Sequence, residues 1–162
     1  ALPISGPGAT IEKEMSAIPI GQAELLRKGK DVAILAFGAM VTPAQAVAER
    51  LDASLVNMRF VKPLDEDMVL QLVTQHTLLV TVEENTVIGG AGTAVNELLA
   101  HKSISAQVLN LGLPDYFVEH GKPEEQLAAV GLNAQGIESS IRKRLEYLAL
   151  NLNDRANEEF TA

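Results

Sequence analysis

The sequence contains no cysteine and no tryptophan, and only 4% of its 162 residues are aromatic. Without cysteine the chain has no disulfide, no thiolate nucleophile and no Cys-ligated metal. The absence also agrees with a cytoplasmic location, where disulfides are rare. With so few aromatic residues the core must be aliphatic. The 47% hydrophobic fraction is ordinary for a globular domain, and this length suits one core better than two.

Clustered positive charge and long apolar runs are missing as well. The formal net charge is −8, and the densest basic group, residues 142–144, lies among acids on a predicted helix. Because neutralising phosphates requires clustered Lys and Arg, nucleic acid is not expected as a partner. No apolar run approaches the roughly 20 residues that span a bilayer. Residues 1–20 also lack the pattern of a signal peptide, so no membrane partner is expected.

The chain divides into three segments by composition. Residues 1–19 contain three of the seven prolines, which predicts a linker or a short segment foreign to the native protein. A domain that begins with such a linker is expected to be part of something longer. Residues 20–150 carry the periodic apolar pattern of one domain, and the polar tail 151–162 is expected to fray.

Within the domain, apolar runs alternate with amphipathic helical patterns. Strands are predicted at residues 21–28, 31–38, 54–60, 77–83 and 106–112. Helices are predicted after Thr42, after Asp65, and at residues 90–100, 123–130 and 134–150. This alternation indicates βαβ units and a mostly parallel sheet. The short link at residues 28–30 reverses the chain, so the first strand should run antiparallel to the others.

Two residues are predicted to cap helices. Thr42 precedes Pro43, which suits a cap followed by proline at the first helical position. Asp65 precedes an acidic first turn and should cap the next helix.

The stretch LVTVEENTVIGGAG, residues 79–92, has the layout of a functional site. Glu83 and Glu84 are adjacent on a strand, so they point to opposite faces and cannot act as an acid/base pair on one substrate. Their place at the carboxyl end of a parallel strand is where open α/β sheets bind ligands. The favoured interpretation is a junction, in which a carboxylate and Asn85 satisfy free backbone N–H groups at the next helix start.

The glycine cluster that follows matches neither the dinucleotide fingerprint nor the P-loop. Glycines instead allow a sharp turn and a close approach of the helix to its sheet or to a partner. The candidate interface with another domain or a second subunit therefore comprises Glu84, Asn85, Gly89, Gly90 and Gly92. The helix N-terminus would offer its N–H groups to that partner.

The loop LPDYFVEHGKP, residues 113–123, supplies a second group of candidates, Asp115, Tyr116 and His120. Polar and aromatic residues on a loop after a strand can form a binding edge, and a structural or interface role is favoured. No residue qualifies as catalytic, cofactor-binding or metal-binding. The sequence shows neither a nucleophile beside a base nor histidines at ligand spacing.

Three stretches together carry a family resemblance: NMRFVKPLDE, LVTVEENTVIGGAGTAVNELL and LNLGLPDYFVEHG. They resemble the C-terminal domain of the 1-deoxy-D-xylulose-5-phosphate synthase family, and the similarity runs from about Ser5 to Leu145. A looser similarity extends to the C-terminal domains of transketolase and of the pyruvate dehydrogenase β-subunit.

The resemblance implies a three-layer α/β/α sandwich around a five-stranded mixed sheet with one antiparallel strand. It implies a thiamine-diphosphate- and Mg²⁺-dependent transferase, a cytoplasmic homodimer that makes a precursor of isoprenoids, thiamine and pyridoxal. The family's metal motif, Gly-Asp-Gly, and its activating glutamate belong to preceding domains and do not occur here.

This chain is therefore expected to be inactive alone, to bind no cofactor, and to contact the preceding domains and the second subunit. Two alternatives stay open, a small-molecule regulatory binding module and the C-terminal domain of another transketolase-like enzyme.

Overall fold

The computed structural model describes the backbone of residues 17–159 and the side chains of residues 17–151. The strands are β1 (Glu24–Arg27), β2 (Val32–Ala36), β3 (Ser54–Asn57), β4 (Leu78–Thr86) and β5 (Val108–Leu113). The helices are α1 (Val41–Leu51), α2 (Glu66–Gln75), α3 (Ala91–His101), α4 (Pro123–Ala129) and α5 (Ala134–Glu159), with a 3-10 turn (Gly38–Met40) before α1.

The five strands form one mixed sheet in the order β1-β3-β2-β4-β5. Strand β1 pairs antiparallel with β3, and all other pairs are parallel. The predicted α/β sheet with one antiparallel strand is thus confirmed. Strand β2 is buried along its whole length at the centre of the sheet, which explains why it reads as a continuous apolar run.

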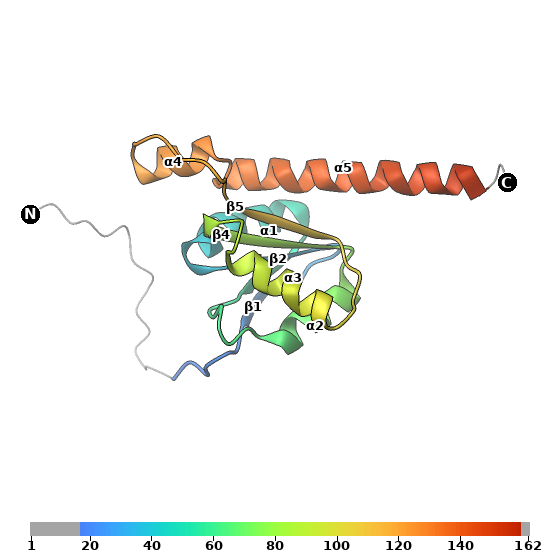
Figure 1. Cartoon of the computed structure of the whole chain (residues 1–162), viewed down its shortest axis with the longest axis horizontal. Coiled ribbons are helices and arrows are strands. Elements are labelled where there is room, and N and C mark those ends of the chain that lie inside the picture. The colour runs from blue at the N-terminus through green and yellow to red at the C-terminus, as the bar shows by residue number, and fades with distance from the viewer. Residues whose placement is uncertain (1–16, 160–162) are drawn as a thin grey trace, which may run out of the picture.

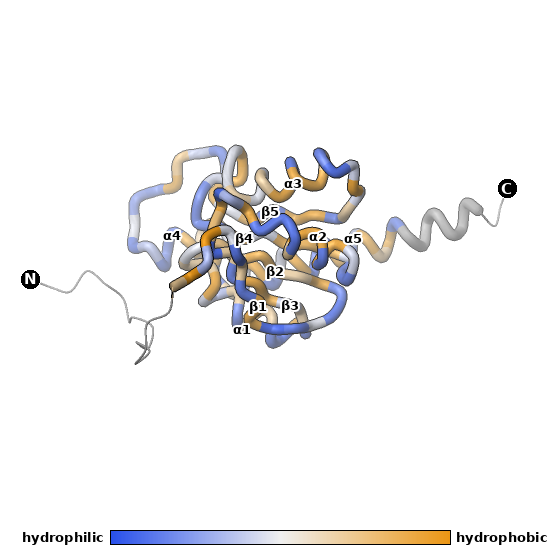
Figure 2. Tube along the Cα trace, turned by 90° about the horizontal axis from the view of Figure 1, so that it is seen from below, coloured by the Kyte–Doolittle hydropathy of each residue, from blue (hydrophilic) through white to orange (hydrophobic). Residues whose placement is uncertain are grey.

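Helices cover both faces of the sheet and make the three predicted layers (Figure 1). Alternate strand residues such as Ile34 and Val80 pack against α1 and α5. Their neighbours Leu35 and Leu79 point the other way and pack against α2 and α3. Figure 2 shows hydrophobic residues concentrated on the central strands, with hydrophilic residues mostly on the surrounding loops.

An ion-pair cluster joins the two helices of one outer layer. Glu138 of α5 accepts hydrogen bonds from Arg50 of α1 and from Arg142 one turn further along α5. Hydrogen bonding to Arg50, and then to Arg142, lowers the pKa of the Glu138 carboxyl below its ordinary value.

Of the two predicted caps, one is wrong and one is confirmed. Helix α1 begins at Val41, because the 3-10 turn leads directly into it, and Met40 rather than Thr42 is the cap residue. Pro43 still falls in the first turn, where its missing N–H costs no intrahelical hydrogen bond.

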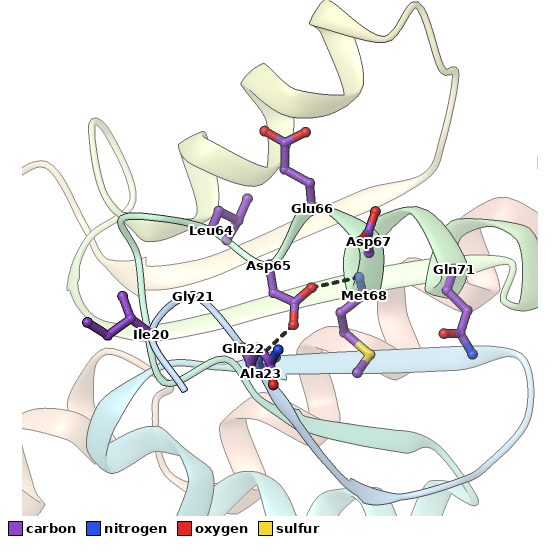
Figure 3. Close-up of a pocket in the computed structure, with 10 residues that line it drawn as sticks. All are labelled: Ile20, Gly21, Gln22, Ala23, Leu64, Asp65, Glu66, Asp67, Met68 and Gln71. Carbon is purple, nitrogen blue, oxygen red and sulfur yellow. Dashed lines mark hydrogen bonds between the residues drawn. The ribbon is translucent and has the colours of Figure 1, made fainter. Parts of the chain in front are cut away.

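Asp65 does cap α2, and it also holds the segment before β1. Its Oδ1 accepts from the N–H of Met68 at 3.0 Å, and its Oδ2 accepts from the N–H of Ala23 at 2.7 Å (Figure 3). A hollow of about 750 Å³ lies at this junction, lined by residues 20–23 and by residues 64–68 with Gln71. Its acidic residues are the cap Asp65 and, in the first turn of α2, Glu66 and Asp67, where negative charge is favourable.

Several element ends differ from the sequence prediction. Strand β3 ends at Asn57, and two residues later Arg59 has a φ of 57°, outside the extended conformation. Its guanidinium group pairs with Glu24 at 2.6 Å. Helix α5 continues to Glu159, past the predicted end near Leu150. The fraying predicted for the tail stays a prediction. Of the linker predicted at residues 1–19, residues 1–16 lie outside the described residues, and residues 17–19 form no helix or strand. Within the described part, no helix combines the length and apolarity needed to cross a membrane.

Candidate functional site

The ladder between β4 and β5 is interrupted at the carboxyl end of the sheet. Val82 lies opposite Leu111, and Thr86 lies opposite Leu113. Residues 83–85 of β4 therefore face Gly112 alone, which makes a bulge. A Cβ at Gly112 would lie 2.7 Å from the carbonyl oxygen of Asn85, so the bulge needs glycine on the neighbouring strand.

Glu83 is the buried anchor of this bulge. Its side chain is on the α3 face of the sheet, and the residue is only 3% exposed. One carboxylate oxygen accepts from the N–H of Ala91 at 2.7 Å, and the other accepts from the N–H of Gly92 at 2.8 Å. A negative charge is favourable at the positive end of the helix dipole. The predicted junction is confirmed, with Glu83 as its carboxylate.

Two other predictions for this junction are wrong. Asn85 was expected to help satisfy the helix start, but its side chain is exposed and makes no hydrogen bond within the described residues. The N–H groups of α3 were expected to be offered to a partner. Those of Ala91 and Gly92 are buried and already bonded to Glu83, so they are not available.

Each glycine of the cluster is required for a local structural reason. A Cβ at Gly90 would overlap the carbonyl oxygen of Thr86 and both carboxylate oxygens of Glu83, and a Cβ at Gly92 would overlap the hydroxyl of Thr81. These two glycines let α3 approach the sheet. Gly89 has a φ of 76° and open space around it, so its requirement is conformational.

Four of the five interface candidates come together around one hollow. Glu84, Asn85, Gly89 and Gly90 line a space of about 290 Å³, with Phe37 and Val61 also in its lining. Gly92 does not line it, because it faces Thr81 behind the helix.

Glu84 also borders a second hollow of about 210 Å³ on the other side. Its apolar lining comes from Leu113, Val118 and Leu127, at the edge where α4 follows β5 (Figure 1). The neighbouring exposed side chains Val61 and Ile88 are apolar as well, and Ile88 is 70% exposed.

The loop candidates lie at a third hollow, of about 510 Å³, against α4. Tyr116 and His120 line it, whereas Asp115 does not. The loop is held by a hydrogen bond from the Gln126 side chain to the carbonyl of Glu119 at 2.8 Å. Because Gln126 lines both the second and the third hollow, the three spaces form a row along one edge of the molecule.

Sequence reasoning missed the one buried acid of the site. Glu83 was recognised as one of two possible junction carboxylates and was not chosen. Strand parity shows only that Glu83 and Glu84 face opposite sides of the sheet. The structure places Glu83 on the face of Leu79 and Thr81, beneath the following helix. Within the described residues, no group of three or more acidic, histidine or cysteine side chains is placed to hold a metal ion.

Comparison with known proteins identifies a family. Residues 21–137 match the family described as Transketolase, C-terminal domain. The 1-deoxy-D-xylulose-5-phosphate synthases of Chromohalobacter salexigens and Alcanivorax borkumensis are 58% and 57% identical to this chain, over 144 and 141 residues. These alignments cover 88% and 87% of the chain but 22% of each relative, so the chain spans about a fifth of their length.

A solved structure shares the fold. The inactive beta4 tetramer of a split-gene transketolase matches with a TM-score of 0.72 and 32% identity. The match covers 78% of this chain and 43% of that one.

Proposed function

The chain belongs to the transketolase C-terminal domain family, and from this membership we propose that it is the C-terminal domain of a 1-deoxy-D-xylulose-5-phosphate synthase. The identity of 56–58% to four enzymes of that name, over 85–88% of the chain, carries the proposal. Such an enzyme decarboxylates pyruvate, releases CO2, and joins the remaining two-carbon unit to D-glyceraldehyde 3-phosphate. The product feeds isoprenoid, thiamine and pyridoxal synthesis.

The domain's role in that enzyme is structural. The carboxyl edge, with Glu84, Asn85 and Gly89, packs against a preceding domain or against the second subunit of a cytoplasmic homodimer. Gly90 and Gly92 shape this edge from behind by letting α3 approach the sheet. Tyr116 and His120 extend the same contact along the row of hollows.

Thiamine diphosphate and Mg²⁺ belong to the preceding domains. The glycine-rich start of α3 does not fit a diphosphate, because the Glu83 carboxylate already accepts the hydrogen bonds of the Ala91 and Gly92 N–H groups. A second anion there would meet a buried negative charge of the same sign. The isolated chain should therefore bind no cofactor and form no product.

A domain exchange tests the proposal. This chain would replace the matching region of the Chromohalobacter salexigens enzyme, and formation of 1-deoxy-D-xylulose 5-phosphate would be measured. We expect an active dimer, with the shortened enzyme lacking this region as the control. In parallel, calorimetric titration of the isolated chain with thiamine diphosphate and Mg²⁺ should give no saturable heat. A folded but inactive chimaera, or clear saturable binding to the isolated chain, would contradict the proposal.

A regulatory binding module is the second candidate, and the row of hollows at the ligand-binding edge of the sheet favours it. In that case an effector would bind among Glu84, Asn85, Gly90 and His120. Chemical-shift mapping of the isolated chain with pyruvate, D-glyceraldehyde 3-phosphate and later pathway metabolites separates the two candidates. Shifts clustered at these residues would support the regulatory binding module, and the absence of such shifts would favour the structural role.

A further inference from the structure

Glu84 is an exposed carboxylate set between two hollows with apolar walls. Phe37 and Val61 contribute to the hollow on one side, and Leu113 and Leu127 to the hollow on the other. Among residues 17–151, no Lys, Arg or His side chain lies within ion-pairing distance of it. The charge thus has no counter-ion in the described part of the chain, although apolar surface adjoins it on both sides.

The backbone at Glu84 is held in place by contacts of the buried residue that precedes it. Its neighbour Glu83 is bonded through both oxygens to α3, and the bulge packs so closely on Gly90 and Gly112 that a Cβ at either position would overlap it. Bulges of this kind re-aim side chains beside functional sites. Glu83 is therefore a positioning residue, and Glu84 is the group that it presents at the surface.

The surroundings of Glu84 suit an arginine side chain. A guanidinium group can donate two parallel hydrogen bonds to a carboxylate, and it is weakly hydrated enough to enter apolar surroundings. Its aliphatic stem can lie along an apolar wall while the charged end reaches the carboxylate. A lysine ammonium is more strongly hydrated and would lose more on entering the same place.

We propose that the Glu84 carboxylate, presented by the Glu83-anchored bulge, binds an arginine from the preceding domains of the same polypeptide. This inference rests on the proposed function, since the relatives carry about four-fifths of their length outside the region matched here. The net charge of −8 favours a basic partner surface. It disfavours a second copy of the same acidic domain placed edge to edge.

Hydrogen exchange in the full-length enzyme tests this contact. Amide exchange of residues 84–90 would be compared between the isolated chain and the whole enzyme, for the wild type, Glu84→Gln and Glu84→Arg. Glu97→Gln is the matched control, because Glu97 is an exposed glutamate on the neighbouring helix α3. We expect joining to the preceding domains to slow exchange in the wild type. Glu84→Gln should reduce that protection about ten- to a hundredfold, the range expected for a charged hydrogen bond, and Glu84→Arg should reduce it further.

The remaining measurements identify the occupant. Glu97→Gln should leave protection unchanged, and all variants should exchange alike in the isolated chain. One arginine of the preceding domains, changed to Gln, should reproduce the Glu84→Gln effect without adding to it. Wild-type protection in the Glu84→Gln enzyme would overturn the inference. So would protection that disappears on dilution to monomers, because the occupant would then be a second copy. Loss of product formation in the domain exchange would instead count against the proposed function, and the exchange data would still decide this contact.

Discussion

Adding one methyl group at Gly90 should destabilise the domain far more than adding one at its neighbour Gly89. At Gly90 the new Cβ would overlap the carbonyl of Thr86 and the carboxylate of Glu83. The backbone there has a φ of −82°, which any residue can adopt, so the whole cost comes from packing. At Gly89 the situation is reversed, since the space is open but φ is 76°.

The size of the effect follows from these contacts. Forcing a methyl group into a filled space costs about 1–3 kcal/mol. If the Glu83 carboxylate also loses one of its two buried hydrogen bonds, a further cost of about 1.5–3 kcal/mol is expected. Gly90→Ala should therefore lower the free energy of unfolding by about 2.5–6 kcal/mol, the sum of these terms. Gly89→Ala should lower it by about 1–2 kcal/mol, the cost of a left-handed conformation with a side chain.

Urea unfolding of the chain, followed by far-UV circular dichroism, measures both variants under identical conditions. A third variant checks the cause. In a Glu83→Ala background the added cost of Gly90→Ala should fall, because one of the two groups that the methyl would overlap is gone. If Gly90→Ala is no less stable than Gly89→Ala, or if its cost is the same with and without Glu83, close packing against the carboxylate is not the reason for this glycine.

Two further predictions concern other parts of the fold. Asp65→Ala should lower the free energy of unfolding by about 2 kcal/mol, since it removes a helix cap and the acceptor for the N–H of Ala23. Asp67→Ala in the same turn is the control, and an equal loss there would contradict a specific role for Asp65. The lowered pKa of the Glu138 carboxyl in the folded state means that its ionised form stabilises the fold, and Glu138→Gln should remove this stabilisation. The difference from wild type should be constant well above the ordinary value of 4.5 and shrink as pH falls through the lowered pKa, so a difference that grows toward acid pH would be the contrary result.

The alternation of apolar runs and helical patterns was enough to predict the fold class. Central strand β2 is buried on both faces, and such strands read as continuous apolar runs in any α/β sheet. The antiparallel first strand followed from the short link before β2, which cannot hold a crossover. Asp65 was identifiable as a cap because its acceptor reaches a donor only three residues away.

Predictions that depended on less local information were less accurate. Thr42 and Pro43 have the composition of a helix start, but the turn from β2 into α1 begins the helix one residue before Thr42. Strand β3 stops before Arg59, which has a positive φ and pairs with Glu24, a partner 35 residues away in the chain. Neither outcome is visible in the residues adjacent to the element.

For the candidate site, too, some features could be predicted from local sequence and others could not. Strand parity and the following glycines determined that one of two adjacent glutamates would serve the helix start and that the other would face outward, because these follow from the period of a strand. Only the tertiary structure decided that Glu83 is the buried one and that Gly90 and Gly92 pack against their own sheet. It also decided that Glu84 stands between two hollows. Those outcomes depend on the bulge opposite Gly112, which is set by the register between β4 and β5 across some 30 residues of chain. Pairing at that distance is governed by how the whole sheet and its helices pack, and no short stretch of sequence specifies it.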